Sequence, residues 1–274
     1  MSRLTGLLES GRPLVMGILN VTPDSFSDGG RFQDVSRAVN HARDMIDGGV
    51  DIIDIGGEST RPGADPVTAQ HEIERVVPVI RAIRLISDIP LSCDTSKAEV
   101  MTASAAAGVD LINDVRALRE EGALEAAAET GLPVCLMHMK GEPRTMQNDP
   151  CYDDLIGEIT VFFESRIDTC VNAGIDRKKL ILDVGFGFGK TPEHNLTLIN
   201  RLDSFTGLEL PLLVGISRKS TIGMIVQDRL IGSIAGALAA LERGASIVRV
   251  HDVSETVEAV RTWQSIRTER VVSP

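Results

Sequence analysis

Short apolar runs alternate with longer stretches of helical periodicity along almost the whole chain, and this alternation limits the folds open to it. Runs of this length suit buried strands, and strands separated by helices are typical of a parallel sheet with crossover helices. The sequence predicts strands at residues 14–19, 51–55, 91–93, 111–112, 134–137, 180–182, 212–216 and 247–250. It predicts helices that include residues 35–47, 68–86, 97–106, 152–173, 233–243 and 254–267.

Glycines follow several helical stretches, as expected of residues that end a helix. They are Gly48 with Gly49, Gly108, Gly131, Gly174 and Gly244. Eight strand–helix units within about 250 residues match the repeat number and size of a (β/α)8 barrel. We therefore expect the α/β class, as a single-domain (β/α)8 TIM barrel over residues 1–274 with residues 1–13 as an N-terminal lead-in. A doubly wound parallel sheet is the alternative.

The charge balance limits the partners of the chain. Its 28 Lys and Arg stand against 39 Asp and Glu, so the formal net charge is −11. Long-range attraction to nucleic acid or to an anionic membrane is therefore not expected. One Trp and one Tyr provide no platform for stacking bases. Any anionic ligand must be bound by cations that the fold places locally.

We expect no signal peptide in the first residues, because Glu9, Arg12 and Pro13 interrupt them, and no run of about 18 apolar residues follows. We expect a soluble, non-exported protein of the cytoplasm. The four cysteines form no C-x-x-C pair, and Cys93 and Cys135 lie in apolar runs. Free thiols in a reducing compartment are the prediction.

Polar side chains follow the predicted strands. They are Asn20, Asp54 with Glu58, Asp94, Asn113, His138, Asp183, Ser217 to Lys219, and Arg249 with His251. In a parallel barrel all the carboxyl ends of the strands share one rim, and active sites are built there. Any single one of these residues could instead cap the following helix. Taken together they predict one polar rim.

The residue types on this rim indicate the ligand chemistry. Asp94 and Asp183 end apolar strands, so a ligand with paired N–H groups would suit their carboxylates. The cations Arg61, Lys219 and Arg249, together with His251, suit a phosphate-type anion.

Metal binding is predicted through oxygen ligands. The five histidines include no pair at i, i+4 and none beside a cysteine, which speaks against zinc. Asn20 and Asp28 fit Mg²⁺ that is shared with substrate phosphates.

The glycine-rich segment at residues 185–191 ends like a Walker loop but fails that motif, because Val184 stands where the first glycine belongs. The alternation G-x-G-x-G is not the dinucleotide fingerprint either. We interpret the segment as backbone that passes close to a flat ligand beside Asp183, with Phe188 as an apolar wall.

The motifs together resemble the dihydropteroate synthase family over nearly the whole chain. The most specific are MGILNVTPDSFSDGG at residues 16–30 and DIGGESTRPG at residues 54–63; residues 94–97, 112–114, 136–138, 183–190, 217–220 and 249–252 add to them. The resemblance implies a barrel, a homodimer and a sulfonamide target. It also implies a transferase of folate biosynthesis, which joins 6-hydroxymethyl-7,8-dihydropterin diphosphate to p-aminobenzoate and releases diphosphate.

The resemblance further implies a role for each matching residue. Pterin would contact Asp94, Asn113, Met137, Asp183, Phe188, Lys219 and Arg249. Diphosphate would contact Asn20, Thr60, Arg61, Arg249 and His251, and Mg²⁺ would bind Asn20 and Asp28. The p-aminobenzoate would contact Phe26, Arg61, Pro62, Phe188, Lys219 and Ser220. The chemistry would depend on Asp28, Arg61, Lys219, Arg249 and His251.

The implied mechanism needs a charge clamp rather than a nucleophilic side chain. Mg²⁺ and the cations would stabilise charge on the departing diphosphate, in an SN1-like step before the arylamine attacks. Residues 21–31 and 58–65 are rich in Gly, Ser, Pro and Asp, and we hypothesise that they close over the diphosphate.

Some positions depart from the family pattern. Val184 and Ala98 replace usual prolines, Cys93 replaces a usual valine, and residues 221–230 form a shortened segment. Two alternatives remain: a non-catalytic pterin-binding paralogue, and a barrel that transfers a methyl group from methyltetrahydrofolate to a corrinoid. The paralogue should lack residues of the first two loops, and the methyltransferase should lack the cationic clamp.

Several polar residues are expected to be structural. His138 is interpreted as a core or capping residue, with direct contact to a ligand as the alternative. Asp54 and Glu58 are interpreted as partners of loop amides or arginines. His41, His71 and His194 are expected on the surface.

Overall fold

Eight parallel strands close into a barrel in sequence order, from β1 to β8 and back to β1. The computed structural model describes residues 3–22, 30–59, 66–141, 146 and 150–272. The strands are β1 (Leu14–Asn20), β2 (Ile52–Gly56), β3 (Leu91–Asp94), β4 (Leu111–Asp114), β5 (Val134–Met137), β6 (Leu180–Asp183), β7 (Leu212–Val214) and β8 (Ile247–Val250). The predicted TIM barrel is confirmed, and the doubly wound sheet is excluded because the sheet closes.

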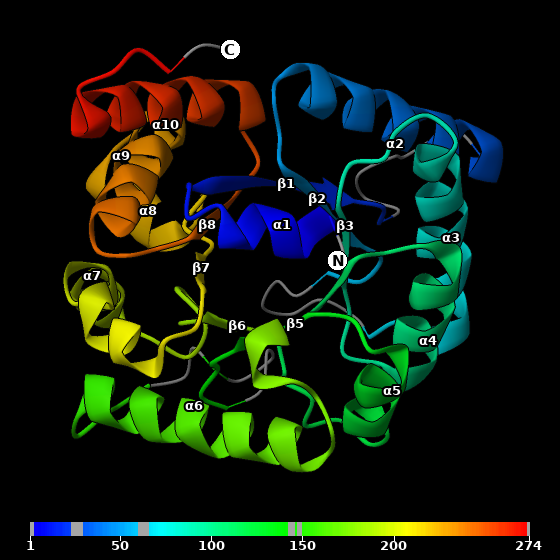
Figure 1. Ribbon diagram of the computed structural model, residues 1–274, viewed down its shortest axis with the longest axis horizontal. Coiled ribbons are helices and arrows are strands. Elements are labelled where there is room, and N and C mark those ends of the chain that lie inside the picture. The colour runs from blue at the N-terminus through cyan, green and yellow to red at the C-terminus, as the bar shows by residue number, and fades with distance from the viewer. Residues whose placement is uncertain (1–2, 23–29, 60–65, 142–145, 147–149, 273–274) are drawn as a thin grey trace.

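Helices surround the strands on all sides (Figure 1). They are α1 (Arg3–Glu9), α2 (Gly30–Asp47), α3 (Ala69–Arg84), α4 (Ala98–Ala107), α5 (Ala123–Thr130), α6 (Leu155–Asn172), α7 (Pro192–Asn200), α8 (Ser220–Ile225), α9 (Arg229–Glu242) and α10 (Val253–Thr268), with 3-10 turns at Arg177–Lys179 and Leu202–Leu208. Each β–α crossover covers one part of the outer face of the sheet, so the strands are buried on both sides.

Local capping explains where several helices begin. The side chain of Asp154 accepts from the Gly157 amide, so α6 starts at Leu155 rather than at residue 152. Asp228 accepts from the Leu230 amide, so α9 starts four residues before the predicted residue 233. An acceptor at the N-cap satisfies an amide that the helix itself cannot. The predicted stop at Gly108 is confirmed, with φ 109 at the C-cap of α4.

The N-terminal lead-in closes one end of the barrel. Leu4 of α1 is fully buried against side chains that begin the strands, and α1 lies across the near end of the barrel in Figure 1. These inward side chains are Leu14, Met16, Ile52, Leu111, Cys135, Ile181, Leu213 and Ile247. This apolar plug fills the lower barrel, so only the opposite end, at the carboxyl ends of the strands, is left for a ligand.

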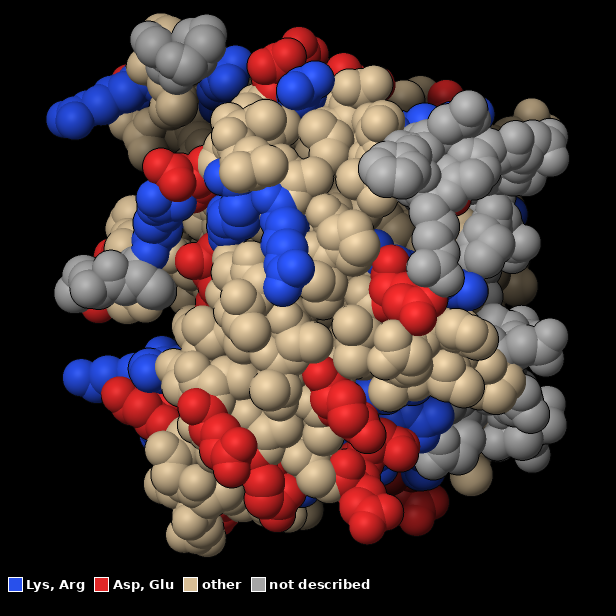
Figure 2. All heavy atoms as spheres, turned by 90° about the vertical axis from the view of Figure 1, so that its right-hand side faces the viewer, with Lys and Arg blue, Asp and Glu red and all other residues tan. Residues whose placement is uncertain are grey.

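The outer face over α2 to α5 carries mixed charge. In Figure 2, Lys and Arg side chains are scattered between Asp and Glu, and the acidic ones gather in the lower half of the face. This agrees with the formal net charge of −11. Within the described ranges, no helix is long and apolar enough to cross a membrane.

The four cysteines are free thiols, as predicted. Cys93, Cys135 and Cys170 are buried and Cys151 is exposed. Burial raises the pKa of the Cys93 and Cys135 thiols well above the ordinary value. Both are therefore unreactive core residues.

Candidate active site

The site stands directly on the apolar plug, because alternate residues of each strand face the barrel interior. The inward residue two positions beyond Ile52 is Asp54, and beyond Leu111 it is Asn113. Met137, Asp183 and Arg249 follow Cys135, Ile181 and Ile247 by the same step. The interior thus changes from apolar to largely polar within one layer, which Asp54 forms together with four of the predicted pterin residues.

Strand register brings the rim residues together. Asn20 pairs with Gly56, Gly56 with Asp94, and Asp94 with Asn113. A Cβ placed on Gly56 would lie 3.5 Å from the Asn20 Oδ1 atom and 3.6 Å from the Asp94 Cβ. The hydrogen bonds between neighbouring strands continue as far as Val21 and Thr95. The strands therefore include Asn20, Asp94 and Asn113, which do not lie in the loops that follow. In contrast, β7 ends at Val214, two residues earlier than expected.

Arg249 joins two carboxylates at the bottom of the site. Its Nε donates to Asp54 Oδ2 at 2.6 Å and its Nη2 donates to Asp94 Oδ2 at 2.8 Å. Although burial disfavours the charged guanidinium, these carboxylates raise the pKa of Arg249 above its ordinary value. Burial raises the pKa of Asp94 to about 7, and Arg249 only partly counteracts this. The expectation that Asp54 pairs with an arginine is confirmed.

Lys219 and Asp183 interact electrostatically at the carboxyl ends of the strands. Burial raises the pKa of Asp183, while Lys219 and the Gly185 amide, which donates to Oδ1 at 2.8 Å, work against this. Burial lowers the pKa of Lys219 to about 8 despite Asp183. The Lys219 ammonium donates to the Phe186 carbonyl and lies 4.6 Å from the centre of the Phe188 ring. A carboxylate and an ammonium that interact in one site suit a ligand edge with both N–H donors and acceptors.

The Arg249 group, with Asp54 and Asp94, adjoins the pair of Lys219 and Asp183. A Cβ on Gly215 would lie 3.8 Å from both the Arg249 Cβ and the Lys219 Nζ. Met137 belongs to an apolar cluster with Val115, Met139 and Met146, against which Phe188 packs. The structure therefore brings Met137 and Phe188 together as an apolar wall beside the polar groups.

The glycine-rich connection after β6 is shaped by protein backbone. Gly185 and Gly189 have φ of 65 and 63. A Cβ on Gly185 would lie 1.8 Å from the His138 carbonyl oxygen, and one on Gly189 would lie 2.2 Å from that of Lys140. The backbone after β5 therefore explains why glycine is needed at both positions, and the approach of a flat ligand to this segment stays a prediction.

His138 is a core residue beneath this connection. It is buried, its ring packs edge-on against Phe162 at 4.8 Å, and its Nδ1 lies 3.0 Å from Lys190 Nζ. Lys190 also donates to the Phe188 carbonyl at 3.0 Å. No role was predicted for Lys190. Its position at the end of the glycine-rich segment is the sequence signal that marks it.

His251 is held by Ser217, another residue that was not singled out as a site residue. The His251 amide donates to Ser217 Oγ at 3.1 Å, and the His251 Nδ1 lies 3.0 Å from the same oxygen. Ser220 is exposed and begins α8, behind Lys219. Arg218, beside them, is exposed and pairs with Asp252, away from the polar layer.

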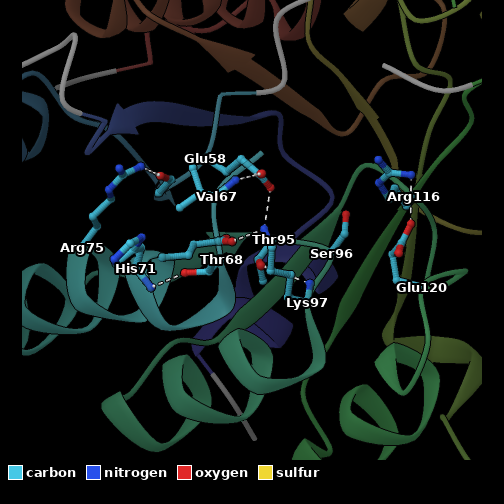
Figure 3. Close-up of polar contacts among 12 residues, drawn as sticks. Glu58, Val67, Thr68, His71, Arg75, Thr95, Ser96, Lys97, Arg116 and Glu120 are labelled. Atoms are coloured by element: carbon cyan, nitrogen blue, oxygen red, sulfur yellow. Dashed lines mark hydrogen bonds and ion pairs between the residues drawn. The ribbon is translucent and has the colours of Figure 1, made fainter. Parts of the chain in front are cut away.

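Glu58 anchors the connection between β2 and α3 (Figure 3). Its Oε1 accepts from the Val67 amide at 2.8 Å, and its Oε2 lies 2.6 Å from Lys97 Nζ. Lys97 also lies 2.6 Å from Glu72, whose side chain is fully buried. The structural role expected of Glu58 is confirmed.

Some predicted residues cannot be placed. Phe26, Asp28, Thr60, Arg61 and Pro62 lie outside the described residues, as does most of the two segments hypothesised to close over the diphosphate. In the described part of the chain there is no group of three or more His, Cys, Asp or Glu that could hold a metal ion.

The remaining sequence expectations concern packing. Val184 and Cys93, which replace usual residues of the family, are fully buried, and Ala98 begins α4. His41 and His71 are exposed as expected. His194 differs, because it is half-buried and forms a reciprocal cap with Thr191 at the start of α7.

Comparison with known proteins agrees with this geometry. The model of a family described as pterin binding enzymes matches residues 16–251. Dihydropteroate synthase of Escherichia coli K12 is 56% identical over 262 residues, which cover 94% of this chain and 93% of that protein. The Yersinia pestis dihydropteroate synthase, solved with a sulfonamide drug, superposes with a TM-score of 0.90 at 57% identity over 95% of this chain and 96% of that one.

A further solved structure contains the reaction product. The Xanthomonas albilineans dihydropteroate synthase in complex with 7,8-dihydropteroate has a TM-score of 0.85 at 45% identity, and covers 93% of this chain and 94% of that one. The polar layer on a closed barrel and these matches lead to one conclusion: the chain belongs to the dihydropteroate synthase family of pterin-binding enzymes.

Proposed function

We propose that this protein is a transferase of folate biosynthesis, which joins 6-hydroxymethyl-7,8-dihydropterin diphosphate to p-aminobenzoate. The products are 7,8-dihydropteroate and diphosphate. The observation that carries the proposal is that Lys219, which interacts electrostatically with Asp183, lies over the Phe188 ring, and that this ring packs against the apolar cluster of Met137. A flat heterocycle with a donor edge and an acceptor edge fits such a slot. The Xanthomonas albilineans relative, solved with 7,8-dihydropteroate, supports the assignment.

Each group in the slot has a separate part in pterin binding. Asp183 would accept from the 2-amino group and the adjacent ring N–H, and Lys219 would donate to the ring oxygen and nitrogen. Asp94 and Asn113 would contact the other edge of the ring, and Arg249 would lie over its face. Hydrogen bonds to charged groups each contribute about 1.5–3 kcal/mol, so the edge contacts would dominate recognition.

The diphosphate would lie toward β1 and β8, where Asn20, Arg249 and His251 approach the rim. Thr60 and Arg61 are proposed to complete this clamp. The carbon–oxygen bond between the pterin methylene and the diphosphate breaks, and its electron pair leaves with the diphosphate. The arylamine nitrogen then forms the new carbon–nitrogen bond and loses a proton. The protein supplies charge stabilisation for the leaving group, for which one donor commonly contributes about 2.7–4 kcal/mol.

Mg²⁺ fits the donor set of this part of the rim. The Asn20 carboxamide is half-buried at the end of β1, and its Oδ1 is on the side of Gly56 and Asp94. Proteins bind Mg²⁺ through one or two such oxygens, with substrate phosphates and water completing the octahedron. Asn20 and Asp28 are the proposed protein ligands. When bound, the ion would neutralise charge on the diphosphate.

The p-aminobenzoate is proposed to bind outside the pterin, near Phe188, Lys219 and Ser220. Phe26, Arg61 and Pro62 would complete the pocket. The exposed start of α8 at Ser220 would receive the carboxylate. A sulfonamide resembles p-aminobenzoate in shape, so it would compete for the same place.

We further propose a homodimer. An apolar cavity of about 370 Å³ opens on the outer face between α7, α8 and α9. Leu196 and Ile225 line it, and they remain 47% and 58% exposed. Met224 and Ile231 extend the apolar surface beside it. Clusters of large exposed apolar side chains commonly mark protein interfaces, and a second copy of this chain is the proposed occupant. The buried free thiols favour a reducing, cytoplasmic location.

The experiment that tests the function is diphosphate release by the purified chain with Mg²⁺ and the pterin diphosphate, with and without p-aminobenzoate. We expect release to require both substrates, and dihydropteroate to be identified by mass. Tight pterin binding without product would support the non-catalytic paralogue instead. Product formed only from methyltetrahydrofolate and a corrinoid would contradict the synthase.

A further inference from the structure

Asp54 is a fully buried carboxylate in the layer beneath the rim. Its neighbours along the interior of β2 are Ile52 of the apolar plug below and Gly56 of the rim above. It therefore lies at the floor of the pterin slot rather than at its mouth. The pterin residues proposed above do not include it.

One oxygen of Asp54 holds two site residues at once. Oδ2 accepts from Arg249 Nε at 2.6 Å and from Asn113 Nδ2 at 3.0 Å. These donors come from β8 and β4, on opposite sides of β2. Oδ1, also buried, has no hydrogen-bond partner among the described residues.

The bond to Arg249 fixes the plane of the guanidinium. Nε donates a hydrogen bond to Asp54 and Nη2 donates one to Asp94. Two hydrogen bonds from one rigid, planar group fix the orientation of its plane. Asp94 alone would leave the group free to turn about its single contact. Because Arg249 is proposed to lie over the pterin face and to reach the diphosphate, the plane of its guanidinium matters for both contacts.

The hydrogen bond from Asn113 to Asp54 fixes which way the Asn113 carboxamide is turned. Only the NH₂ group can donate to a carboxylate, so Asn113 must place Nδ2 toward Asp54 and Oδ1 on its other branch. The amide therefore offers a ligand its acceptor. Together with Asp94 and Asp183, this makes the edge of the slot rich in acceptors, which suits the N–H groups of a pterin.

The free-energy cost of burying the Asp54 carboxylate indicates that this residue does more than fill space in the core. A buried carboxylate with one unsatisfied oxygen stabilises a fold no better than an apolar side chain of similar size. The geometry points to Asp54 as a positioning residue for pterin recognition, which orients Arg249 and Asn113 from beneath the ligand. This inference rests on the proposed function and adds a residue to it.

The test uses Asp54→Asn and Asp54→Ala in the full-length chain, with the affinity for 6-hydroxymethyl-7,8-dihydropterin measured by calorimetry. Asparagine can place its carbonyl where Oδ2 lies and keep both hydrogen bonds, so we expect a loss of affinity of less than about tenfold. Alanine removes both bonds, and we expect a loss of about ten- to a hundredfold. If Asp54→Ala is not folded, Asp54→Ser, which cannot reach both donors, takes its place.

A structural role alone would give a different pattern, and two controls separate the cases. Asp114→Asn changes a buried carboxylate that follows Asn113 but bonds Ser96 and the Arg116 amide. We expect it to lower Tm while affinity stays within about threefold. In an Asn113→Ala background, the effect of Asp54→Ala should shrink, because part of it acts through the lost amide.

Two outcomes would overturn the inference. One is that Asp54→Ala, or Asp54→Ser in its place, binds the pterin as the wild type does. The other is that its loss of affinity is the same in the wild-type and the Asn113→Ala backgrounds. If the wild type itself binds no pterin, the proposed function fails, and that result is distinct from either of these.

Discussion

The ammonium nitrogen of Lys190 lies 3.0 Å from Nδ1 of the buried His138, and this contact ties the end of the glycine-rich connection to the end of β5. Both side chains are nearly inaccessible, at 2% for Lys190 and 5% for His138. Burial lowers the pKa of Lys190 to about 7. Burial, followed by Lys190, lowers the pKa of His138 to about 2. Burial thus shifts both groups toward their neutral forms in the folded chain.

The stability of the fold should therefore depend on pH through His138. The unfolded chain takes up a proton on this residue as the pH falls through 6.5, whereas the folded chain does not until about pH 2. Stability contributed by the neutral form is then present above pH 6.5 and is lost below it, by up to about 1.4 kcal/mol per pH unit. In urea unfolding, His138→Gln should approach the wild type as the pH falls from 6.5 to 4.5. Parallel curves would contradict this.

The cluster of Lys97 with Glu58 and Glu72 should be a stability determinant of the β2–α3 connection (Figure 3). Lys97→Met leaves the fully buried Glu72 without its cation, and we expect a loss of about 3–5 kcal/mol in the free energy of unfolding. Replacing both partners, in Lys97→Met with Glu72→Leu, should recover most of it. Denaturant unfolding measures each variant. A double variant as unstable as the single one would show that the charge is not the cause.

Two glycines with the same backbone conformation give a matched comparison. Gly185 and Gly131 have φ of 65 and 63, but only Gly185 has a neighbour, the His138 carbonyl at 1.8 Å from an added Cβ. Gly131→Ala should lose about 1–2 kcal/mol from the left-handed backbone alone. Gly185→Ala should lose more, and should also weaken pterin binding because Asp183 precedes it. Equal losses, with pterin binding unchanged, would mean that the close approach has no consequence.

The order of strands and the polar rim could be predicted because both are local patterns. Each apolar run is followed by its polar residue in the sequence, so the sequence alone predicts that Asn20, Asp94 and Asp183 share one rim. The exact ends of the strands are harder to predict from the sequence than their order. β7 is short because the chain turns after Val214, and the Lys219 amide bonds back to Ile216.

What sequence reasoning missed are contacts between distant segments. Asp54 and Arg249 are 195 residues apart, and nothing local to either one specifies the partner. The glycines at 185 and 189 were recognised as unusual, yet their reason lies in the backbone of residues 138 and 140. Lys190 contacts the core residue His138 and Ser217 contacts His251, and each pair joins the ends of two different strands, so these contacts exist only in the closed barrel.

The apolar cavity between α7, α8 and α9 should be covered in solution. Light scattering after gel filtration should give the wild type about twice its mass of 29.5 kDa. Leu196→Glu with Ile225→Glu should give a monomer, because two charges would be buried in the interface. Val161→Glu is the control, since Val161 is 64% exposed on α6 and does not line the cavity. A wild-type monomer would contradict the proposed dimer.

The most direct test of the account is dihydropteroate formation by the wild type and by Asp183→Asn, measured together with both substrates and Mg²⁺. The substitution keeps the shape of the side chain but replaces an acceptor oxygen with a donor, which faces the donor edge of the pterin. We predict product from the wild type, and a rate lower by about ten- to a hundredfold or more in the variant at an unchanged Tm. Equal rates would contradict the assignment of Asp183 as the residue that recognises the pterin.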